Sequence, residues 1–415
     1  MFAKLFAAPL MMFGLAGSCW GQGIPDLTAE QWREDVDALV AGIERDHREA
    51  WNFVPRAEVM RLADEAAQRA GAATDAEMLV ALQRIAAAVG DGHTFVDVSG
   101  LYSRYPFDVS WIEGDFYIVR SGASHGELLG GKLVAIDDTP VDQALEKLLS
   151  LVPRNENRFH EIDALSGLLT QAEPLFALGV ARSPNGATFD VETADGRRER
   201  IHLAPREPSQ PTEFVTIGPN GRPAAVEPPR GLRLSMLDDV AYLDFASYAD
   251  LEKESAIVWS AIDRAGARAL IIDFRKNRGG SLAAGREYIS YAAWARSQLN
   301  RAGCLFVLTG PTTFSAAMTN VTDLRRETEA TIVGLPTGAR PNGYQENKLF
   351  TLPNSRLRVS AAQRRYRFGS PGDTAVMPDL WIEQTIDDWR RGRDTTLEAA
   401  LSSAQGCRRL SAPAD

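Results

Sequence analysis

The sequence predicts an α/β protein whose C-terminal half contains a largely parallel sheet. From residue 231 onward, short apolar runs alternate with helix-like segments, the pattern of βα units. The runs 269–273 and 305–308 are apolar at nearly every position, which is typical of strands buried on both faces. The 415 residues, 45% hydrophobic and 24% charged, exclude disorder, collagen and coiled coil for the whole chain, and the length predicts two or three domains.

Residues 1–22 are predicted to be a signal peptide. Lys4 supplies a positive charge, and the apolar stretch 5–15 is too short to cross a bilayer as a helix. The small residues before Cys19 fit either an ordinary cleavage site or an imperfect lipoprotein site, in which Cys19 would be acylated. We therefore expect an exported protein, periplasmic or extracellular, whose membrane attachment would be limited to a lipid anchor at Cys19.

The next segment, residues 23–100, is predicted to be helical. Thr28 and Gln31 form a capping-box pattern at the start of the first of three helices. The third helix is expected to stop at the glycines around His93.

Residues 101–204 read as a small β-rich domain with one or two helices, because short β-type runs alternate with glycine-rich turns. Residues 205–230 hold seven of the 22 prolines and are expected to form a linker or surface excursion. The α/β core follows from 231 to 415. Its last helix is predicted from Thr395, with Thr395 and Glu398 as the capping box.

Composition limits the kinds of partner and cofactor that we expect. With 45 Lys+Arg against 55 Asp+Glu, the net charge of −10 argues against a general nucleic-acid binder. The three cysteines are widely spaced, so we expect no structural zinc site. Nothing else in the sequence implies a metal or an organic cofactor. Cys304 and Cys407 could pair in an exported protein or remain two buried thiols, and the sequence leaves both open.

Two turns could carry chemistry. The first, residues 273–281, connects a buried strand to a helix, and Gly279 and Gly280 would let an anionic group approach bare N–H groups. Taken alone, a simple tight turn without chemistry explains this segment better. The second turn places Ser315 between a buried strand and a helix, where a hydroxyl can project from a strained turn. Taken alone, Ser315 is better explained as a helix N-cap.

A third candidate is His93 in the turn Asp91-Gly92-His93-Thr94. A histidine there can act as a base only if another group orients it, and a lone histidine is more often structural. Together, however, these features resemble the tail-specific (C-terminal processing) and tricorn-core superfamily of serine peptidases. The matching segments, in the family's order, are 91–94, 133–141, 272–280, 314–317, 333–334, 337–338, 352–355, 378–379 and 392–394.

The resemblance implies a crotonase-like catalytic core of ββα repeats, a PDZ-like peptide-binding domain and an N-terminal helical segment. It also implies how the serine is activated. The lysine of the bacterial processing branch is replaced by Arg340, and a guanidinium keeps its proton and cannot be a general base. His93 matches the histidine of the tricorn-like branch.

By this resemblance Ser315 is the nucleophile, His93 is the base, and the amides of Gly279 or Gly280 and of Ala316 form the oxyanion hole. The family's late glutamate, which orients the histidine, corresponds to Asp373, with Asp91 as a second candidate. Arg278 and Arg340 are expected to contact substrate, Arg278 through a terminal carboxylate.

The expected function is an exported serine peptidase, either an endopeptidase or one that acts near C-termini, with a peptide or protein substrate. Two alternatives remain at this point. One is a peptide- or lipid-binding scaffold of the same fold with decayed chemistry, suggested by Gly92, where the family has a serine, and by the missing lysine. The other is a hydrolase of non-peptide esters or amides, since the same chemistry serves all acyl transfers. The oligomeric state is not predicted.

Overall fold

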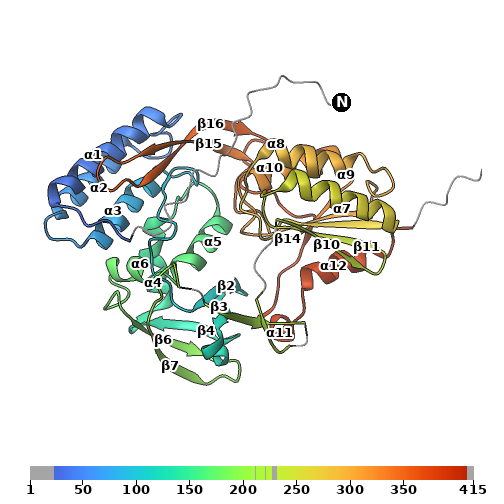
Figure 1. The fold of residues 1–415 in the computed structure, drawn as a ribbon, viewed down its shortest axis with the longest axis horizontal. Coiled ribbons are helices and arrows are strands. Elements are labelled where there is room, and N and C mark those ends of the chain that lie inside the picture. Colours follow the sequence, from blue (N-terminus) through green and yellow to red (C-terminus); the bar gives the residue numbers. More distant parts are fainter. Residues whose placement is uncertain (1–22, 211, 220, 227–230, 409–415) are drawn as a thin grey trace, which may run out of the picture.

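The computed structural model describes residues 23–210, 212–219, 221–226 and 231–408 (Figure 1). The predicted signal peptide and Cys19 lie outside the described residues. The described residues form a mixed α/β structure with three sheets, so the coarse α/β class of the prediction is confirmed. Within them, no helix has the length and apolar character that a membrane crossing requires.

The N-terminal segment contains the three predicted helices. Thr28 and Gln31 form the expected capping box, and Thr74 and Glu77 form a second one. The third helix ends just before Gly90, whose φ of +101° is favourable only for glycine. The helices are α1 (Ala29–Asp46), α2 (Arg56–Arg69) and α3 (Asp75–Ala88).

The β-rich region is built on a sheet in the order β7-β6-β4-β3-β8-β9, with β2 paired to β3 and β5 paired to β4. The predicted hairpin around residues 194–196 is present as β6 and β7. The strands are β2 (Phe107–Ile112), β3 (Asp115–Gly122), β4 (Lys132–Ile136), β5 (Thr139–Pro140), β6 (Ala187–Glu192) and β7 (Arg198–Leu203). The helices are α4 (Val141–Leu148), α5 (Arg158–Leu168) and α6 (Ala172–Ala177).

Part of the proline-rich segment is a hairpin rather than a plain linker. Strands β8 (Phe214–Ile217) and β9 (Pro223–Ala225) extend the sheet beside β3. The run that forms β8 contains no proline, and Pro223 is the first residue of a strand at the sheet edge. Proline is tolerated there because no ladder hydrogen bond is lost.

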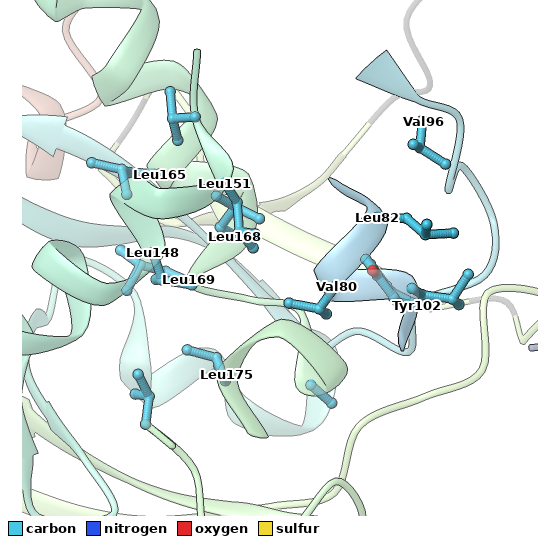
Figure 2. Close-up of a cluster of buried hydrophobic side chains, with 14 of the residues drawn as sticks. Val80, Leu82, Val96, Tyr102, Leu148, Leu151, Leu165, Leu168, Leu169 and Leu175 are labelled. Carbon is cyan, nitrogen blue, oxygen red and sulfur yellow. The ribbon is translucent and has the colours of Figure 1, made fainter. Parts of the chain in front are cut away.

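The N-terminal helices and the β-rich region share one hydrophobic core. Figure 2 shows Val80 and Leu82 of α3 in the same cluster as Leu168 of α5 and Leu175 of α6. Tyr102, in the connection between the two segments, is also buried in this cluster. The two segments distinguished in the sequence therefore pack as one unit, which fixes α5 relative to the turn that carries His93.

The C-terminal half contains the predicted, largely parallel sheet, in the order β10-β11-β12-β13-β14-β17 (Figure 1). Only the β10–β11 pair is antiparallel among these strands. The strands are β10 (Leu232–Leu237), β11 (Val240–Phe245), β12 (Ala269–Asp273), β13 (Leu305–Thr309), β14 (Thr331–Gly334) and β17 (Leu380–Trp381).

Helices cover both faces of this sheet. One apolar cluster joins a sheet face to α7 (Leu251–Ala265), the π-helical turn η3 (Arg286–Tyr291), α9 (Ala292–Trp294) and α10 (Ala316–Glu327). The short helix α8 (Leu282–Gly285) lies on the same side, and α11 (Ile386–Arg390) precedes the last helix. A second cluster joins the other face to α12 (Thr395–Ala404).

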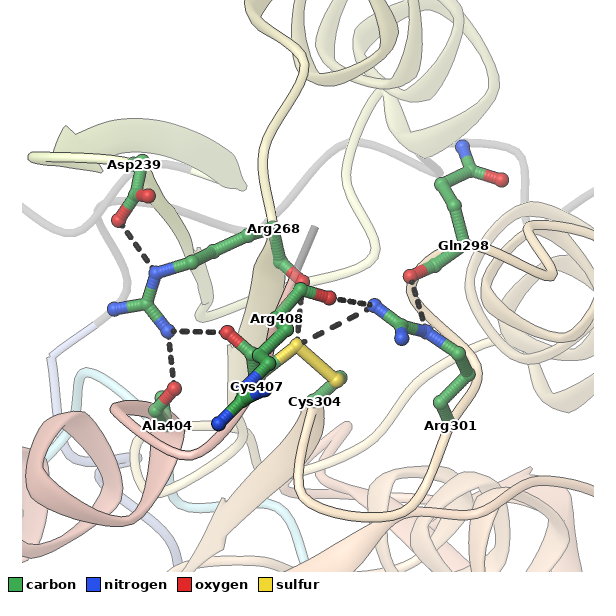
Figure 3. The surroundings of a disulfide bond; sticks show 8 residues. All are labelled: Asp239, Arg268, Gln298, Arg301, Cys304, Ala404, Cys407 and Arg408. Carbon is green, nitrogen blue, oxygen red and sulfur yellow. Dashed lines mark hydrogen bonds and ion pairs between the residues drawn. A yellow bond between two sulfur atoms is a disulfide. The ribbon is translucent and has the colours of Figure 1, made fainter. Parts of the chain in front are cut away.

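The cysteines left open by the sequence form a disulfide. Cys304, just before β13, is bonded to Cys407, just after α12 (Figure 3). Arg268 donates hydrogen bonds to the carbonyl oxygens of Ala404 and Cys407, which adds a second link between the sheet and the end of α12.

The predicted capping box of α12 was wrong by one residue. The N-cap is Asp394, whose Oδ1 accepts the amide hydrogen of Leu397 at 3.0 Å. Glu398 instead forms an ion pair with Arg393 at 2.6 Å. An aspartate directly before Thr395 is an equally good cap, and its second oxygen also binds Arg275 at 2.7 Å.

A long hairpin of β15 (Asn342–Thr351) and β16 (Arg358–Arg367) connects the two halves of the molecule. It extends from the α/β core to the N-terminal helices (Figure 1). There β16 pairs with β1 (Phe95–Val96), the two residues that follow the His93 turn. Gly42 of α1 lies against the Phe350 ring so closely that a Cβ would come within 2.2 Å of it. The hairpin thus anchors the histidine turn from the C-terminal half of the chain.

Candidate active site

Ser315 lies in a strained turn between β13 and α10. Its φ of 50° and ψ of −126° are unfavourable for a residue with a side chain. Although it occupies the N-cap position, its side chain caps no amide. Its Oγ lies 2.9 Å from Nε2 of His93, 222 residues away in the sequence. The helix-cap explanation therefore does not account for this serine.

The backbone of His93 is held on both sides. Its N–H donates to Oδ1 of Asp91 at 3.0 Å, and its carbonyl accepts a hydrogen bond from the Ser360 hydroxyl of β16 at 2.7 Å. Thr94, the next residue, accepts the amide hydrogen of Ala362 through its hydroxyl. These hydrogen bonds fix the backbone from which the His93 ring extends.

The His93 ring is buried and stacked. Its centroid lies 5.1 Å from that of Phe314, which also stacks with His160 at 5.0 Å. Burial lowers the pKa of His93, while the Asp91 charge and the Tyr344 backbone carbonyl oppose this and raise it. The ring is therefore neutral at physiological pH, and Ser315 can donate its hydroxyl hydrogen to Nε2 when Nδ1 carries the other proton.

Asp91 supports the His93 backbone rather than its ring. Its second oxygen, Oδ2, lies 3.0 Å from Nε2 of His47, a buried histidine of the turn after α1. His47 Nδ1 accepts the Glu49 amide hydrogen at 2.9 Å, so Nε2 is the nitrogen that donates to Asp91. No described residue hydrogen-bonds the Nδ1 atom of His93.

The structure does not bring Asp373 to His93. Asp373 is exposed, and its Oδ2 accepts the amide hydrogen of Ser370 at 2.7 Å within its own turn. The Asp373 amide in turn donates to the Ser370 carbonyl at 3.1 Å. The expected orienting role is therefore not supported, because this short turn satisfies the carboxylate locally.

The glycine turn packs directly against the nucleophile turn. Gly279 has φ +101°, and a Cβ there would lie 2.7 Å from Cβ of Ser315. A Cβ on Gly280 would lie 2.7 Å from the Tyr248 ring. The Gly279 N–H donates to Oδ1 of Asn277 at 2.9 Å, whereas no described residue accepts the N–H of Gly280 or of Ala316. Of the predicted oxyanion-hole donors, Gly280 and Ala316 are the ones free to serve.

The two arginines expected to bind substrate contact the protein itself. Arg278 forms an ion pair with Asp163 of α5, with Nη1 2.5 Å from Oδ2. Nη1 of Arg340 donates to the backbone carbonyl of Asn155 at 2.6 Å. Arg278 remains 67% exposed and could still reach a ligand, whereas Arg340 is directed at the segment before α5.

Three titratable residues near His93 and Ser315 were not identified as site residues from the sequence. They are His47 beside Asp91, His160 against Phe314, and the buried Glu156, which accepts the Gly92 amide hydrogen at 3.0 Å. No motif marks them, because each reaches the site through tertiary packing. Among the described residues, no group of three or more His, Cys, Asp or Glu side chains could hold a metal ion.

Comparison with solved structures places this geometry in a known fold. Mature CPAF in complex with lactacystin matches with a TM-score of 0.63 and 15% identity, over 92% of this chain and 98% of CPAF. The chain has the fold of CPAF. A second crystal structure of mature CPAF matches with a TM-score of 0.62 and 14% identity, over 92% of this chain and 97% of CPAF.

A further match is the photosystem II D1 C-terminal processing protease, with a TM-score of 0.45 and 15% identity, over 89% of this chain and 99% of that protein. No protein-family model matches the sequence. No curated protein matches it either.

Proposed function

We propose that this protein is a serine peptidase of the tail-specific and tricorn-like type that uses a Ser–His pair. The observation that carries the proposal is the 2.9 Å contact between Nε2 of His93 and Oγ of Ser315. The strained backbone of Ser315 and the two unpaired amides beside it support the same reading. A serine with a purely structural role would need neither a strained backbone nor unpaired amides beside it.

In the proposed reaction, Oγ of Ser315 attacks the carbonyl carbon of a peptide bond while its proton moves to Nε2 of His93. The N–H groups of Gly280 and Ala316 bind the oxyanion of the tetrahedral intermediate. One such donor contributes about 3–4 kcal/mol to the transition state. His93 then protonates the leaving amine, and the acyl-enzyme remains. A water molecule, deprotonated by His93, hydrolyses it and restores Ser315.

The positive charge that develops on His93 is stabilised although no carboxylate forms a hydrogen bond to its ring. Burial keeps the pKa of His93 low, so the free base dominates before reaction. The imidazolium formed during attack is stabilised by the nearby charge of Asp91 and by the Tyr344 carbonyl, both of which raise that pKa.

We further propose that the α/β half is a crotonase-like core and that the region 101–204 is a PDZ-like domain that presents polypeptide ends. The motif order of the family and the shared fold with CPAF support this assignment. The disulfide between Cys304 and Cys407 supports export, because such bonds persist in oxidising compartments.

One observation favours the decayed scaffold as a second candidate. The Tyr344 carbonyl acts on the His93 ring strongly enough to raise its pKa, but Nδ1 completes no hydrogen bond to any described residue, whereas an active base is usually oriented through this atom. Under this alternative the protein binds a peptide or lipid without turnover. Hydrolysis of a non-peptide ester without any peptidase activity would point to the third possibility, an acyl hydrolase.

Labelling by a fluorophosphonate probe tests the proposal. The wild type and the surface variant Ser403→Ala should be labelled, whereas Ser315→Ala and His93→Ala should not. The same four proteins should be compared for cleavage of a fluorogenic peptide. Because CPAF was solved with lactacystin, that compound is a suitable competitor in the labelling assay. Equal labelling of Ser315→Ala and wild type would refute the assignment.

A further inference from the structure

One short segment, residues 155–163, contacts each part of the chain that supplies the candidate site. At its start, the Asn155 amide donates to the Gly90 carbonyl at 2.9 Å, at the edge of the histidine turn. The side chain of Asn157 donates to the carbonyl of Thr337, in the loop after β14, at 3.1 Å. At its end, Asp163 accepts the hydroxyl hydrogen of Thr312 at 2.6 Å, three residues before the nucleophile.

Glu156 is the buried charged group of this segment. Only 6% of the residue is exposed. Its Oε1 accepts the amide hydrogen of Gly92 at 3.0 Å, and its Oε2 accepts that of Arg340 at 3.2 Å. One carboxylate therefore joins the residue next to His93 to the loop after β14, and it comes from a third part of the chain.

The missing side chain at position 92 makes this contact possible. A Cβ on Gly92 would lie 3.2 Å from Cγ of Glu156 and 2.6 Å from Cζ of Phe314. Phe314 is also the ring on which His93 stacks. The departure from the family pattern at Gly92 is thus explained by the close packing of Glu156 and Phe314.

We propose that Glu156 is a positioning residue: its ionised carboxylate holds the Gly92 and Arg340 amides together and so keeps His93 within reach of Ser315. The inference rests on the proposed function, but its structural part can be tested separately. Only the ionised form has two unprotonated oxygens for the two amides. Protonation occupies one oxygen and weakens one of the two bonds.

The surroundings of Glu156 determine the pH at which its carboxylate is protonated. The pKa of Glu156 is raised to about 7, mainly by burial and to a smaller extent by the neighbouring Asp91 charge. The two amide hydrogen bonds and the Arg340 guanidinium act in the opposite direction. The imidazole of His93, on the turn that Glu156 holds, is neutral in this range because its own pKa is lowered. Glu156 is therefore ionised above neutral pH and loses its charge just below it, before His93 is protonated.

Glu156→Gln tests the role, because glutamine offers one acceptor oxygen and turns an NH₂ group towards the second amide. At pH 8.5 we expect kcat/KM for the fluorogenic peptide to fall about tenfold, as a misplaced base would require. As the pH is lowered through 7, the wild type should lose activity and approach the variant. In the pH–activity profile of Glu156→Gln, activity should therefore fall only at a lower pH than in the wild type, where His93 itself is protonated. Glu146→Gln, on the exposed side of α4, is the matched control and should keep the wild-type profile.

A second measurement does not depend on catalysis. The chain has five histidines, so ¹⁵N-histidine labelling gives a small set of ring resonances that single substitutions can assign. The His93 ring of the wild type should show a step near pH 7, and Glu156→Gln should abolish it. A His93 titration and an activity profile unchanged by Glu156→Gln would overturn the positioning role. A wild type with the His93 step but without labelling or hydrolysis would instead overturn the proposed function alone.

Discussion

The side-chain oxygen of Asn277 accepts the amide hydrogen of Gly279 at 2.9 Å, which removes that amide from the set of oxyanion donors. The Asn277 amide group also donates to the Phe245 carbonyl at 2.9 Å, and the Asn277 backbone carbonyl accepts the Phe314 amide hydrogen. The buried side chain of Asn277 thus fixes the glycine turn against β11, while its backbone carbonyl links that turn to the nucleophile turn.

Replacing this side chain should therefore affect stability and catalysis together. Asn277→Ala removes the hydrogen bonds of its side chain to the Phe245 carbonyl and the Gly279 amide, at a cost of about 1–3 kcal/mol in the free energy of unfolding. We also expect kcat to fall, because the Gly280 amide is no longer held in place. Urea unfolding and steady-state kinetics measure the two effects. Asn185→Ala, at an exposed site, should change neither.

The glycine at position 279 should be required for a steric reason. In Gly279→Ala the new methyl group would lie 2.7 Å from Cβ of Ser315, so we expect kcat/KM to drop by about 100-fold or more. Gly266→Ala is the matched control. It also has positive φ, at +60°, but open space around it, so it should lose about 1–2 kcal/mol of stability and no activity. Similar activity losses in both variants would contradict the proposed geometry.

The charge of Asp91 should set the basicity of His93. Because that charge raises the pKa of His93, Asp91→Asn should lower it further, and the His93 ring should stay neutral to a lower pH. The ¹⁵N titration of His93 gives the direction of the shift. The activity should fall at every pH, since the imidazolium of the transition state loses its nearby counter-charge.

Asp373→Asn should have no such effect. Its carboxylate contacts the Ser370 amide in an exposed turn and does not reach His93. A pH–activity profile superimposable on that of the wild type is expected. A large loss of kcat in Asp373→Asn would show that the turn around Ser370 rearranges to reach the histidine when substrate binds.

The disulfide should contribute to stability but not to chemistry. Cys304 and Cys407 close a loop of 103 residues, and losing such a cross-link costs about 2–5 kcal/mol. It lies at the start of β13, whereas Ser315 follows the end of that strand. The double variant Cys304→Ser/Cys407→Ser should therefore unfold at lower urea concentration, with kcat at 25 °C unchanged.

The sequence predicted the elements that carry strong local signals. The buried strands 269–273 and 305–308, and the helix capped by Thr28 and Gln31, were all found as expected. Periodicity and capping chemistry act within a few residues, so a single sequence reveals them. The same holds for Ser315 and His93, whose motifs placed both at the ends of regular elements, and the structure brings them together.

What the sequence could not reveal depends on packing between distant segments. Glu156 has no motif, and its importance follows from two amides that lie 64 and 184 residues away. Asp373 shows the opposite case. Its position near Pro378 and Asp379 fitted the family order, but a local turn satisfied its carboxylate. Residue spacing does not reveal which partner a carboxylate finds when a nearer amide competes.

The pairing of β1 with β16 has a consequence for biosynthesis. The turn that carries the imidazole emerges from the ribosome early, but the strand that anchors it, Arg358–Arg367, is made only after the nucleophile itself. Until that strand has been synthesised and has folded back, the turn that carries His93 lacks its anchor from the C-terminal half. The growing chain therefore passes through most of its translation before the support of the His93 turn is complete.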